Sequence, residues 1–237
     1  MSTVKVLASG SRRNGYLIKT DSSCLIIEAG VRLSDIKNDL NYDMSKICGC
    51  VITHEHKDHS RYINEYLKNG IRCYLSKGTK EALNINSPYL QEIYPGNIFK
   101  VGEYKVLPFD TKHDCKEPVG HLINHRDFGN LIFATDTYYL PNRFRNLNNI
   151  MIECNYSKEL LDIDNITANR KKRILSSHMS IDTCIDTLKA NDLSSVRNIM
   201  LLHLSNAHSN ADEFKTIIEK ETGIPVTIAE KGVVMGL

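Results

Sequence analysis

Three of the nine histidines of this chain, together with an aspartate, fall within six positions of the segment THEHKDHS, residues 53–60. The segment follows the apolar run CGCVI, which predicts a buried β-strand that ends at the edge of a sheet. Imidazole and carboxylate groups are the usual ligands of zinc, manganese and iron, and ligands two residues apart can bind one ion while the next two bind a neighbour. This spacing predicts a two-metal centre on His54, His56, Asp58 and His59. The alternative is a polar loop in which Asp58 or Ser60 caps a helix.

Short apolar runs bounded by turn residues predict many β-strands with helices between them. The predicted strands are residues 4–8, 16–20, 24–30, 49–53, 72–76, 104–109, 120–124, 130–136, 150–154 and 198–204, followed by a strand pair within 226–237. Helical periodicity covers residues 33–40, 61–70, 180–191 and 210–223. This pattern favours layered sheets with helices outside them.

The composition is that of a folded globular protein, with 41% hydrophobic and 24% charged residues. We find no repeat, linker or compositional break, so residues 1–237 are predicted to form a single domain. The seven cysteines are odd in number and scattered through apolar runs, which favours reduced core thiols over a disulfide framework. No leader and no run of roughly 18 apolar residues is present, which predicts a cytoplasmic protein with no membrane contact.

The pattern His-x-His-x-Asp-His after a strand resembles the signature of the metallo-β-lactamase fold, an α/β fold built as a four-layered αββα sandwich. The resemblance implies a later His, Asp and His at strand ends, matched here by His113, Asp136 and His203. His121 competes with His113, whereas His125 and His208 are expected in surface loops. The resemblance further implies two divalent ions, Zn²⁺ or Mn²⁺. His54, His56 and His113 would bind one ion, Asp58, His59 and His203 the other, and Asp136 would bridge them.

A further histidine narrows the resemblance. The segment SSHMS, which contains His178, and the strand-end acid Glu153 are similar to an arrangement in ribonuclease Z and in the bacterial metallo-β-lactamase-fold 5′ to 3′ exonucleases. In those enzymes the histidine, supported by the acid, contacts the scissile phosphate or protonates the leaving oxygen. Alternatively, His178 merely precedes a helix capped by Ser180. The opening segment LASGSRRNGYLI, residues 7–18, also resembles the exonucleases, in which a Gly-Ser-x-x-Asn loop lies near the site.

The resemblance implies phosphodiester hydrolysis by a metal-bound hydroxide, with Asp58 contacting the attacking water and His178 as general acid. A β-lactamase needs no such histidine, so β-lactam and glyoxalase-type thioester hydrolysis are less favoured. His113 and Asp136 are only 23 positions apart, which leaves no room for the protruding arm of ribonuclease Z. Asp136 and His203 are 67 apart, which is too few for the inserted domain of ribonuclease J.

Two substrates remain open. The first is nucleic acid, cleaved by a compact exonuclease that would use Arg12, Arg13 and the basic segment 169–173 on the backbone. The alternative is a cyclic mononucleotide immune signal, which phage phosphodiesterases of this fold destroy; the small net charge of +2 favours it. The segment 87–97 is interpreted as a lid, a contact of a homodimer or a plain surface loop. A third hypothesis, an interaction module without turnover, is disfavoured by the complete ligand set.

Overall fold

Two β-sheets form the centre of the molecule in the computed structural model, which describes residues 1–164 and 166–237. Each sheet has seven strands. The first runs in the order β14 (Val234–Gly236), β1 (Thr3–Ala8), β2 (Gly15–Lys19), β3 (Cys24–Ile27), β4 (Ile47–Val51), β5 (Cys73–Ser76) and β6 (Leu90–Ile93). The second runs in the order β13 (Val226–Ile228), β12 (Asn198–Leu202), β11 (Leu147–Glu153), β10 (Gly129–Ala134), β9 (Val119–His125), β8 (Tyr104–Asp110) and β7 (Phe99–Val101).

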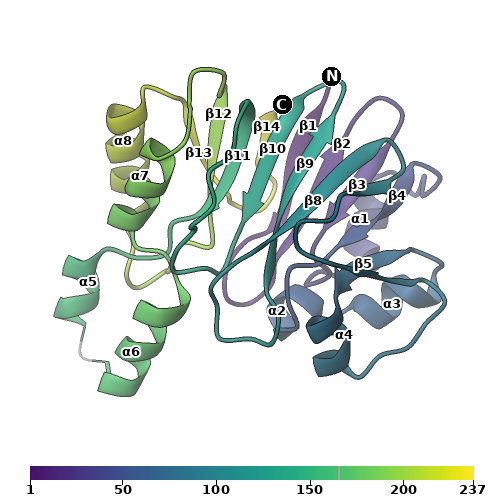
Figure 1. Cartoon of the computed structure of the whole chain (residues 1–237), viewed down its shortest axis with the longest axis horizontal. Helices are drawn as coiled ribbons and strands as arrows, with labels where there is room; N and C mark the ends of the chain where they lie inside the picture. The colour runs from purple at the N-terminus through teal and green to yellow at the C-terminus, as the bar shows by residue number, and fades with distance from the viewer. Residues whose placement is uncertain (165) are drawn as a thin grey trace.

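Helices cover the outer face of each sheet, and Figure 1 shows them on opposite sides of the central pair. On one side lie α1 (Leu33–Asp39), α3 (Ile63–Lys68) and α4 (Lys77–Leu83). On the other lie α7 (Ile181–Lys189) and α8 (Ala211–Thr222). The short helix α2 (Lys57–Ser60) follows β4, whereas α5 (Lys158–Ile163) and α6 (Ala168–Ser177) lie beyond the sheet edge. The layer order is α, β, β, α, which confirms the predicted sandwich.

Both faces of each sheet are buried, so the strands carry apolar side chains on both faces instead of on one face only. In β2, Tyr16 and Ile18 pack in the core between the sheets, while Leu17 packs under the helices of the first layer. Phe214 of α8 and Leu188 of α7 belong to a third core, which lies on the outer face of the second sheet. These three apolar cores pack the two sheets against each other and the helices against the sheets.

The strand directions bring several strand ends to one edge of the sandwich. Strands β3 to β6 are parallel, as are β10 to β13, and β8 has the same direction as β10 because both are antiparallel to β9. Loops that follow parallel strands emerge at the same edge. Side chains that follow β4, β8, β10 and β12 therefore gather there, although they are far apart in the sequence.

The last two strands form as predicted but do not pair with each other. β13 pairs with β12 in the second sheet, whereas β14 pairs with β1 in the first. The intervening segment crosses between the sheets, and it is held on β1 by the bonds from Gly232 N to Val6 O and from Val6 N to Val233 O. The prediction that these two strands pair with each other was therefore wrong. The sequence of a short polar connection does not show whether it forms a hairpin or crosses to the other sheet. Strands β6 and β7 and helices α4, α5 and α6 were not predicted as elements.

None of the helices in the described part of the chain combines the length and apolar character needed to span a bilayer. Two of the histidines that were expected at the surface are buried. His125 stacks on Phe128 with ring centroids 5.3 Å apart, and His208 bonds the Asp164 carboxylate at 2.6 Å. The expectation of exposure was wrong because an aromatic ring packs on His125 at the end of β9, and the Asp164 carboxylate pairs with His208 in the turn after β12.

The fully buried His121, on β9, makes the stability of the fold depend on pH. Burial lowers its pKa to about 3, against a smaller opposing contribution from the backbone of Ile52. Between this value and the ordinary pKa of about 6.5, the unfolded chain binds a proton that the folded chain does not. We expect the free energy of unfolding to fall by about 1.4 kcal/mol from this residue for each unit that the pH drops through that window.

Denaturant unfolding between pH 6.5 and 4.5 tests this expectation in the wild type and in His121→Leu. As the pH falls, the free energy of unfolding of the wild type should decrease more steeply than that of the variant. Parallel pH dependences would show that His121 does not contribute in this way.

Candidate metal centre

Nine side chains named from the sequence lie at the shared strand edge. His54 and His56 follow β4, Asp58 and His59 lie in α2, and the others follow or end β8, β10, β11, α6 and β12: His113, Asp136, Glu153, His178 and His203. Three groups of these residues have ligand atoms within 4.8 Å of one another, namely His54, His56, His113 and Asp136; Asp58, His59 and Asp136; and Asp136, Glu153, His178 and His203. The structure thus brings all nine together, and Asp136 belongs to every group.

The Asp136 carboxylate is the centre of the cluster. Its Oδ2 atom lies 3.7 Å from His54 Nε2, 3.5 Å from His113 Nε2 and 3.2 Å from His59 Nε2. Its Oδ1 atom accepts a hydrogen bond from His203 Nδ1. His203 is grouped with Glu153 and His178 rather than with Asp58 and His59. His113 joins the cluster, whereas His121 lies in none of the three groups.

The protonation states of His54 and Asp136 suit a metal ion, whereas His59 would have to release a proton on binding one. Burial alone would lower the pKa of His59, but Asp136 and Glu28 raise it well above its ordinary value. Burial lowers the pKa of His54 well below its ordinary range, and His59 lowers it further, so His54 is neutral. Burial alone would raise the pKa of Asp136, but His203 and His59 hold it well below the usual range, so the carboxylate is ionised. Neutral imidazole and ionised carboxylate are the forms that bind metals.

Hydrogen bonds also fix which nitrogen of two histidines carries the proton. Thr53 Oγ1 donates to Glu28 Oε1 at 2.6 Å, so it accepts from His54 Nδ1 at 2.9 Å. His113 Nδ1 donates to the carbonyl oxygen of Ser177 at 2.8 Å. In His54 the Nε2 lone pair is therefore free and faces Asp136, whereas His113 Nε2 accepts from His56 Nδ1 at 3.1 Å and lies 3.5 Å from Asp136 Oδ2.

Other polar atoms in the cluster are buried without a partner in the described part of the chain. His54 Nε2 and His203 Nε2 have no hydrogen-bond partner there. A buried polar atom without a partner costs free energy unless something else satisfies it. The nitrogen and oxygen donors, their protonation and these two atoms fit a divalent metal ion.

Glu28 supports the cluster from below, and sequence reasoning missed it. The fully buried carboxylate accepts from Thr53 Oγ1, accepts from Thr53 N at 3.3 Å, and lies 3.2 Å from His59 Nδ1. Glu28 thus lies at ion-pair distance from His59 and orients His54 through Thr53. An acid directly after the apolar run CLII was the only signal in the sequence.

Replacing Glu28 with glutamine should lower metal affinity and activity by about 10- to 100-fold, because groups that orient ligands have effects of that size. Metal content after dialysis against a graded chelator, measured beside turnover, checks this expectation. A variant that retains wild-type affinity would show that His54 and His59 hold their orientation without Glu28. The exposed Glu159→Gln is the matched control.

The loop before β2 closes the other side of the cluster. Asn14 is buried, and its Nδ2 lies 3.2 Å from Asp58 Oδ2 and 2.9 Å from His59 Nε2. Its Oδ1 accepts from Gly10 N at 2.9 Å, which stabilises the loop itself. Ser9 Oγ accepts from His203 N at 3.0 Å. The sequence placed this loop near the site, but it did not identify these contacts.

His178 and Glu153 form a buried pair beside the cluster. His178 Nδ1 donates to Glu153 Oε1 at 2.6 Å, so its Nε2 is free to hold and give a proton. Burial alone would lower the pKa of His178, but the Glu153 carboxylate raises it to about 9. His178 also ends α6, and Ser180 caps α7 by accepting from Thr183 N. The capping alternative is thus correct for Ser180, and it does not exclude a role for His178.

Three residues of this region have backbone angles in the left-handed region. Glu28, Asp136 and His203 have φ of 69°, 48° and 53°. Such angles are uncommon outside glycine, and they cluster where a site requires a particular side-chain direction. Each of the three residues follows a strand, so the turn directs its side chain into the cluster.

A cleft of about 1040 Å³ opens above the cluster. Its walls carry six cationic side chains, Arg12, Arg13, Lys57, Arg170, Arg173 and Lys231. Arg12 and Arg13 were predicted near the site, and the basic segment 169–173 forms part of α6, which presents Arg170 and Arg173 to the cleft. No Phe, Tyr or Trp lines this cleft among the described residues.

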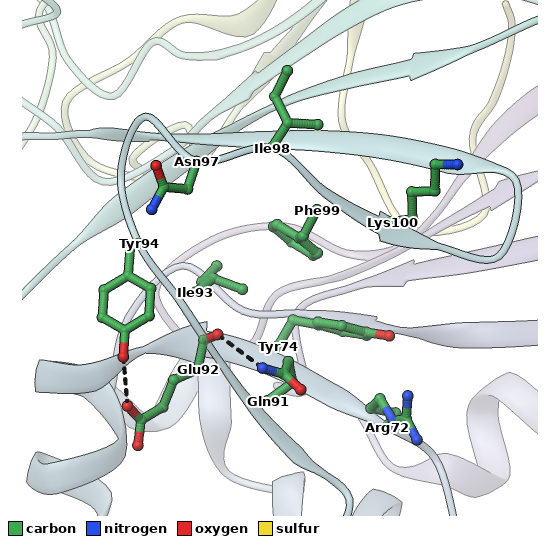
Figure 2. Close-up of a pocket in the computed structure, with 10 residues that line it drawn as sticks. All are labelled: Arg72, Tyr74, Gln91, Glu92, Ile93, Tyr94, Asn97, Ile98, Phe99 and Lys100. Atoms are coloured by element: carbon green, nitrogen blue, oxygen red, sulfur yellow. Dashed lines mark hydrogen bonds between the residues drawn. The ribbon is translucent and has the colours of Figure 1, made fainter.

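A second, smaller hollow of about 230 Å³ lies between β6 and β7 (Figure 2). Tyr74 and Phe99 stack in it with ring centroids 5.1 Å apart, and Tyr94 donates to Glu92 at 3.0 Å. Residues of the segment 87–97 line this hollow, and none of them lines the cleft. The lid interpretation of this segment is therefore wrong.

The chain is similar in sequence to known exodeoxyribonucleases. The chain is 27% identical over 222 residues to the exodeoxyribonuclease WalJ of Streptococcus pneumoniae serotype 2, covering 86% of this chain and 82% of the relative. It is 26% identical over 215 residues to the exodeoxyribonuclease YycJ of Bacillus anthracis, covering 84% and 81%. No family model matches the chain.

Solved structures show the same fold. The metallo-β-lactamase fold protein YhfI from Bacillus subtilis superposes with a TM-score of 0.73 at 15% identity, over 100% of both chains. The short form of human tRNase Z superposes with a TM-score of 0.66 at 14% identity, over 99% of this chain and 98% of the other. This chain therefore has the metallo-β-lactamase fold and is similar in sequence to the exodeoxyribonucleases WalJ and YycJ, which confirms the resemblance of its histidine motifs.

Proposed function

We propose that this chain, a metal-dependent phosphodiester hydrolase, is an exonuclease that removes nucleotides from the 5′ end of DNA. One observation carries the proposal: imidazole nitrogens of four histidines converge on the ionised Asp136 carboxylate at the floor of a cleft with cationic walls. The similarity to two exodeoxyribonucleases over more than four-fifths of the chain supports DNA as the substrate.

The proposed centre holds two divalent ions, Zn²⁺ or Mn²⁺. His54, His56 and His113 would bind one ion, Asp58, His59 and His203 the other, and Asp136 would bridge them. When bound, such ions lower the pKa of water and offset the charge of a phosphate. The protein residues then have to place the phosphate, orient the water and supply a proton to the leaving oxygen.

Two side chains are proposed to act directly on the reacting atoms. The Asp58 carboxylate, whose side chain is 18% exposed to the cleft, would accept a hydrogen bond from the attacking water. His178 would give its Nε2 proton to the leaving oxygen, because Glu153 binds the opposite nitrogen and favours the charged ring. Glu153 acts through His178 and is a positioning residue.

The cleft walls suit a polymer backbone. Arg12, Lys57, Arg170 and Lys231 line the cleft and form no ion pair among the described residues. Phosphate neutralisation by such side chains supplies most of the nonspecific affinity for nucleic acid and makes it dependent on salt.

The cyclic mononucleotide alternative receives no support from the cleft. A pocket for a single nucleotide needs an aromatic ring or a tight apolar wall against the base, and this cleft is large and lined by polar and cationic groups. The cytoplasmic location, the homodimer and the single-domain organisation stay predictions.

The test uses protein loaded with Zn²⁺ or Mn²⁺ on oligonucleotides labelled at the 5′ or the 3′ end, beside a panel of cyclic mononucleotides. A 5′ label should be released at once as a mononucleotide, while a 3′ label should mark progressively shorter strands. Turnover of a cyclic nucleotide with intact DNA would overturn the proposal, and early loss of the 3′ label would reverse the direction.

The cationic walls make a separate prediction. Arg170→Ala should weaken DNA binding and reduce the slope of log affinity against log salt by about 1. Arg72→Ala is the matched control, because Arg72 lines the small hollow instead of the cleft. Binding isotherms at several salt concentrations provide the measurement, and equal slopes for both variants would remove Arg170 from the DNA path.

A further inference from the structure

Two neighbouring tyrosines lie exposed just beyond the metal centre, and the proposed function does not use them. Tyr138 and Tyr139 are 42% and 50% exposed. They follow Asp136 by two and three positions, in the connection from β10 to β11. Among the exposed large apolar side chains of the described residues, these two alone are adjacent in the sequence. Large rings in water cost free energy that packing would recover, so a function is worth seeking.

The backbone of this tyrosine pair is attached to the catalytic groups. Thr137 N donates to Glu153 Oε2 at 2.7 Å, and Glu153 holds His178 through its other oxygen. Lys112 N donates to Thr137 Oγ1 at 2.9 Å, and Tyr138 N donates to Lys112 O at 3.1 Å. The tyrosine pair therefore has a defined position on the side of the centre where His178 lies.

The far end of the same connection is also anchored. Leu140 and Phe144 are buried, and the ring of Phe144 lies 4.8 Å from that of Phe109. Phe144 N donates to Asn191 Oδ1 at 2.7 Å. With both ends attached, the exposure of Tyr138 and Tyr139 is a property of a defined loop rather than of a free end.

The charge around the tyrosine pair is positive. Residues 137–146 include Arg143 and Arg145 and contain no acid. Both arginines and the neighbouring Lys112 are exposed and form no ion pair in the part of the chain that the structure describes. Exposed rings beside unpaired cations are the combination that binds single-stranded nucleic acid, because bases stack on the rings while phosphates meet the cations.

We propose that Tyr138 and Tyr139 form a stacking shelf for the bases of a single-stranded DNA end whose scissile phosphate lies in the cleft. The proposal rests on the proposed function and names the form of DNA that the site takes. The cleft itself offers no aromatic ring among the described residues, so the proposal places base stacking outside the residues that line it. Because Thr137 N bonds Glu153, which holds His178, the proposal assigns to the shelf the nucleotide that carries the leaving oxygen.

The test measures equilibrium binding of fluorescein-labelled 12-nucleotide DNA to the protein loaded with Zn²⁺ or Mn²⁺, with a non-hydrolysable methylphosphonate link at the scissile position. Two strands are compared, one with normal bases and one with abasic sites next to the scissile position. The wild type should bind the normal strand about tenfold more tightly. The Tyr138→Ala/Tyr139→Ala variant should lose this preference, whereas Tyr138→Phe/Tyr139→Phe should keep it.

Tyr94→Ala is the matched control, because Tyr94 is 48% exposed but lines the small hollow. Equal binding of the normal and abasic strands by the wild type would overturn the shelf, and so would a double alanine variant that keeps the preference. Hydrolysis of bis(p-nitrophenyl) phosphate by the wild type separates the two hypotheses. Activity on this ester without activity on any DNA would overturn the proposed exonuclease, whereas DNA shortening without a base preference would overturn the shelf alone.

Discussion

Replacing Asp136 with asparagine is expected to abolish hydrolysis and to strip divalent metal from the protein. Asp136 is common to all three groups of ligand atoms, and its oxygens face four histidines. Asparagine keeps the shape of the side chain but removes the negative charge that offsets a cation in a buried site. The remaining neutral imidazoles would then have to hold the ions with fewer anionic partners.

Metal content by mass spectrometry and turnover of end-labelled DNA together check this expectation. Activity should fall to that of metal-free protein, and added Zn²⁺ or Mn²⁺ should restore little of it. Asp192→Asn is the matched control, because Asp192 is exposed in the connection before β12 and, among the described residues, bonds only Ser194. A variant with normal metal content and normal turnover would contradict the assignment of Asp136.

Replacing His178 with alanine is expected to lower kcat on DNA by about 10²- to 10⁴-fold, which is the usual contribution of a general acid. Metal content should stay unchanged, because Thr53 and the Ser177 carbonyl oxygen, rather than the His178 ring, orient His54 and His113. The loss should depend on the leaving group. A deoxyribose oxygen needs a proton as the bond breaks, whereas p-nitrophenolate leaves without one.

Bis(p-nitrophenyl) phosphate therefore separates a proton donor from a structural residue. The His178→Ala variant should hydrolyse this ester at close to the wild-type rate while its activity on DNA collapses. Glu153→Gln should show the same pattern, because glutamine cannot favour the charged ring of His178. Equal losses on both substrates would show that His178 holds the site together instead of donating a proton.

The strand-end histidines could be predicted because their signal is local. The spacing within residues 53–60 and the apolar runs before His113, Asp136 and His203 are properties of short segments. Parallel strands of one sandwich deliver such segments to one edge, so the cluster followed once the fold was recognised. The layered architecture was likewise predictable, because alternating apolar runs of strand length have few other solutions.

Other features depend on segments that meet only in three dimensions. Glu28 and Asn14 are ordinary residues after or before a strand, and only the packing of their loops against α2 makes them supports for His59. The sequence also contains no local signal for the placement of β13 and β14 in different sheets, or for the burial of His125 and His208.

The amino-acid sequence by itself determined which chemistry this protein can carry, because ligand types and strand ends are written in short segments. Only the tertiary structure decided which nitrogen of His54 is free, which cations face the cleft, and that Tyr138 and Tyr139 remain exposed. The physical reason is that hydrogen bonding, burial and exposure depend on the long-range packing of two sheets, and neither periodicity nor spacing specifies that packing.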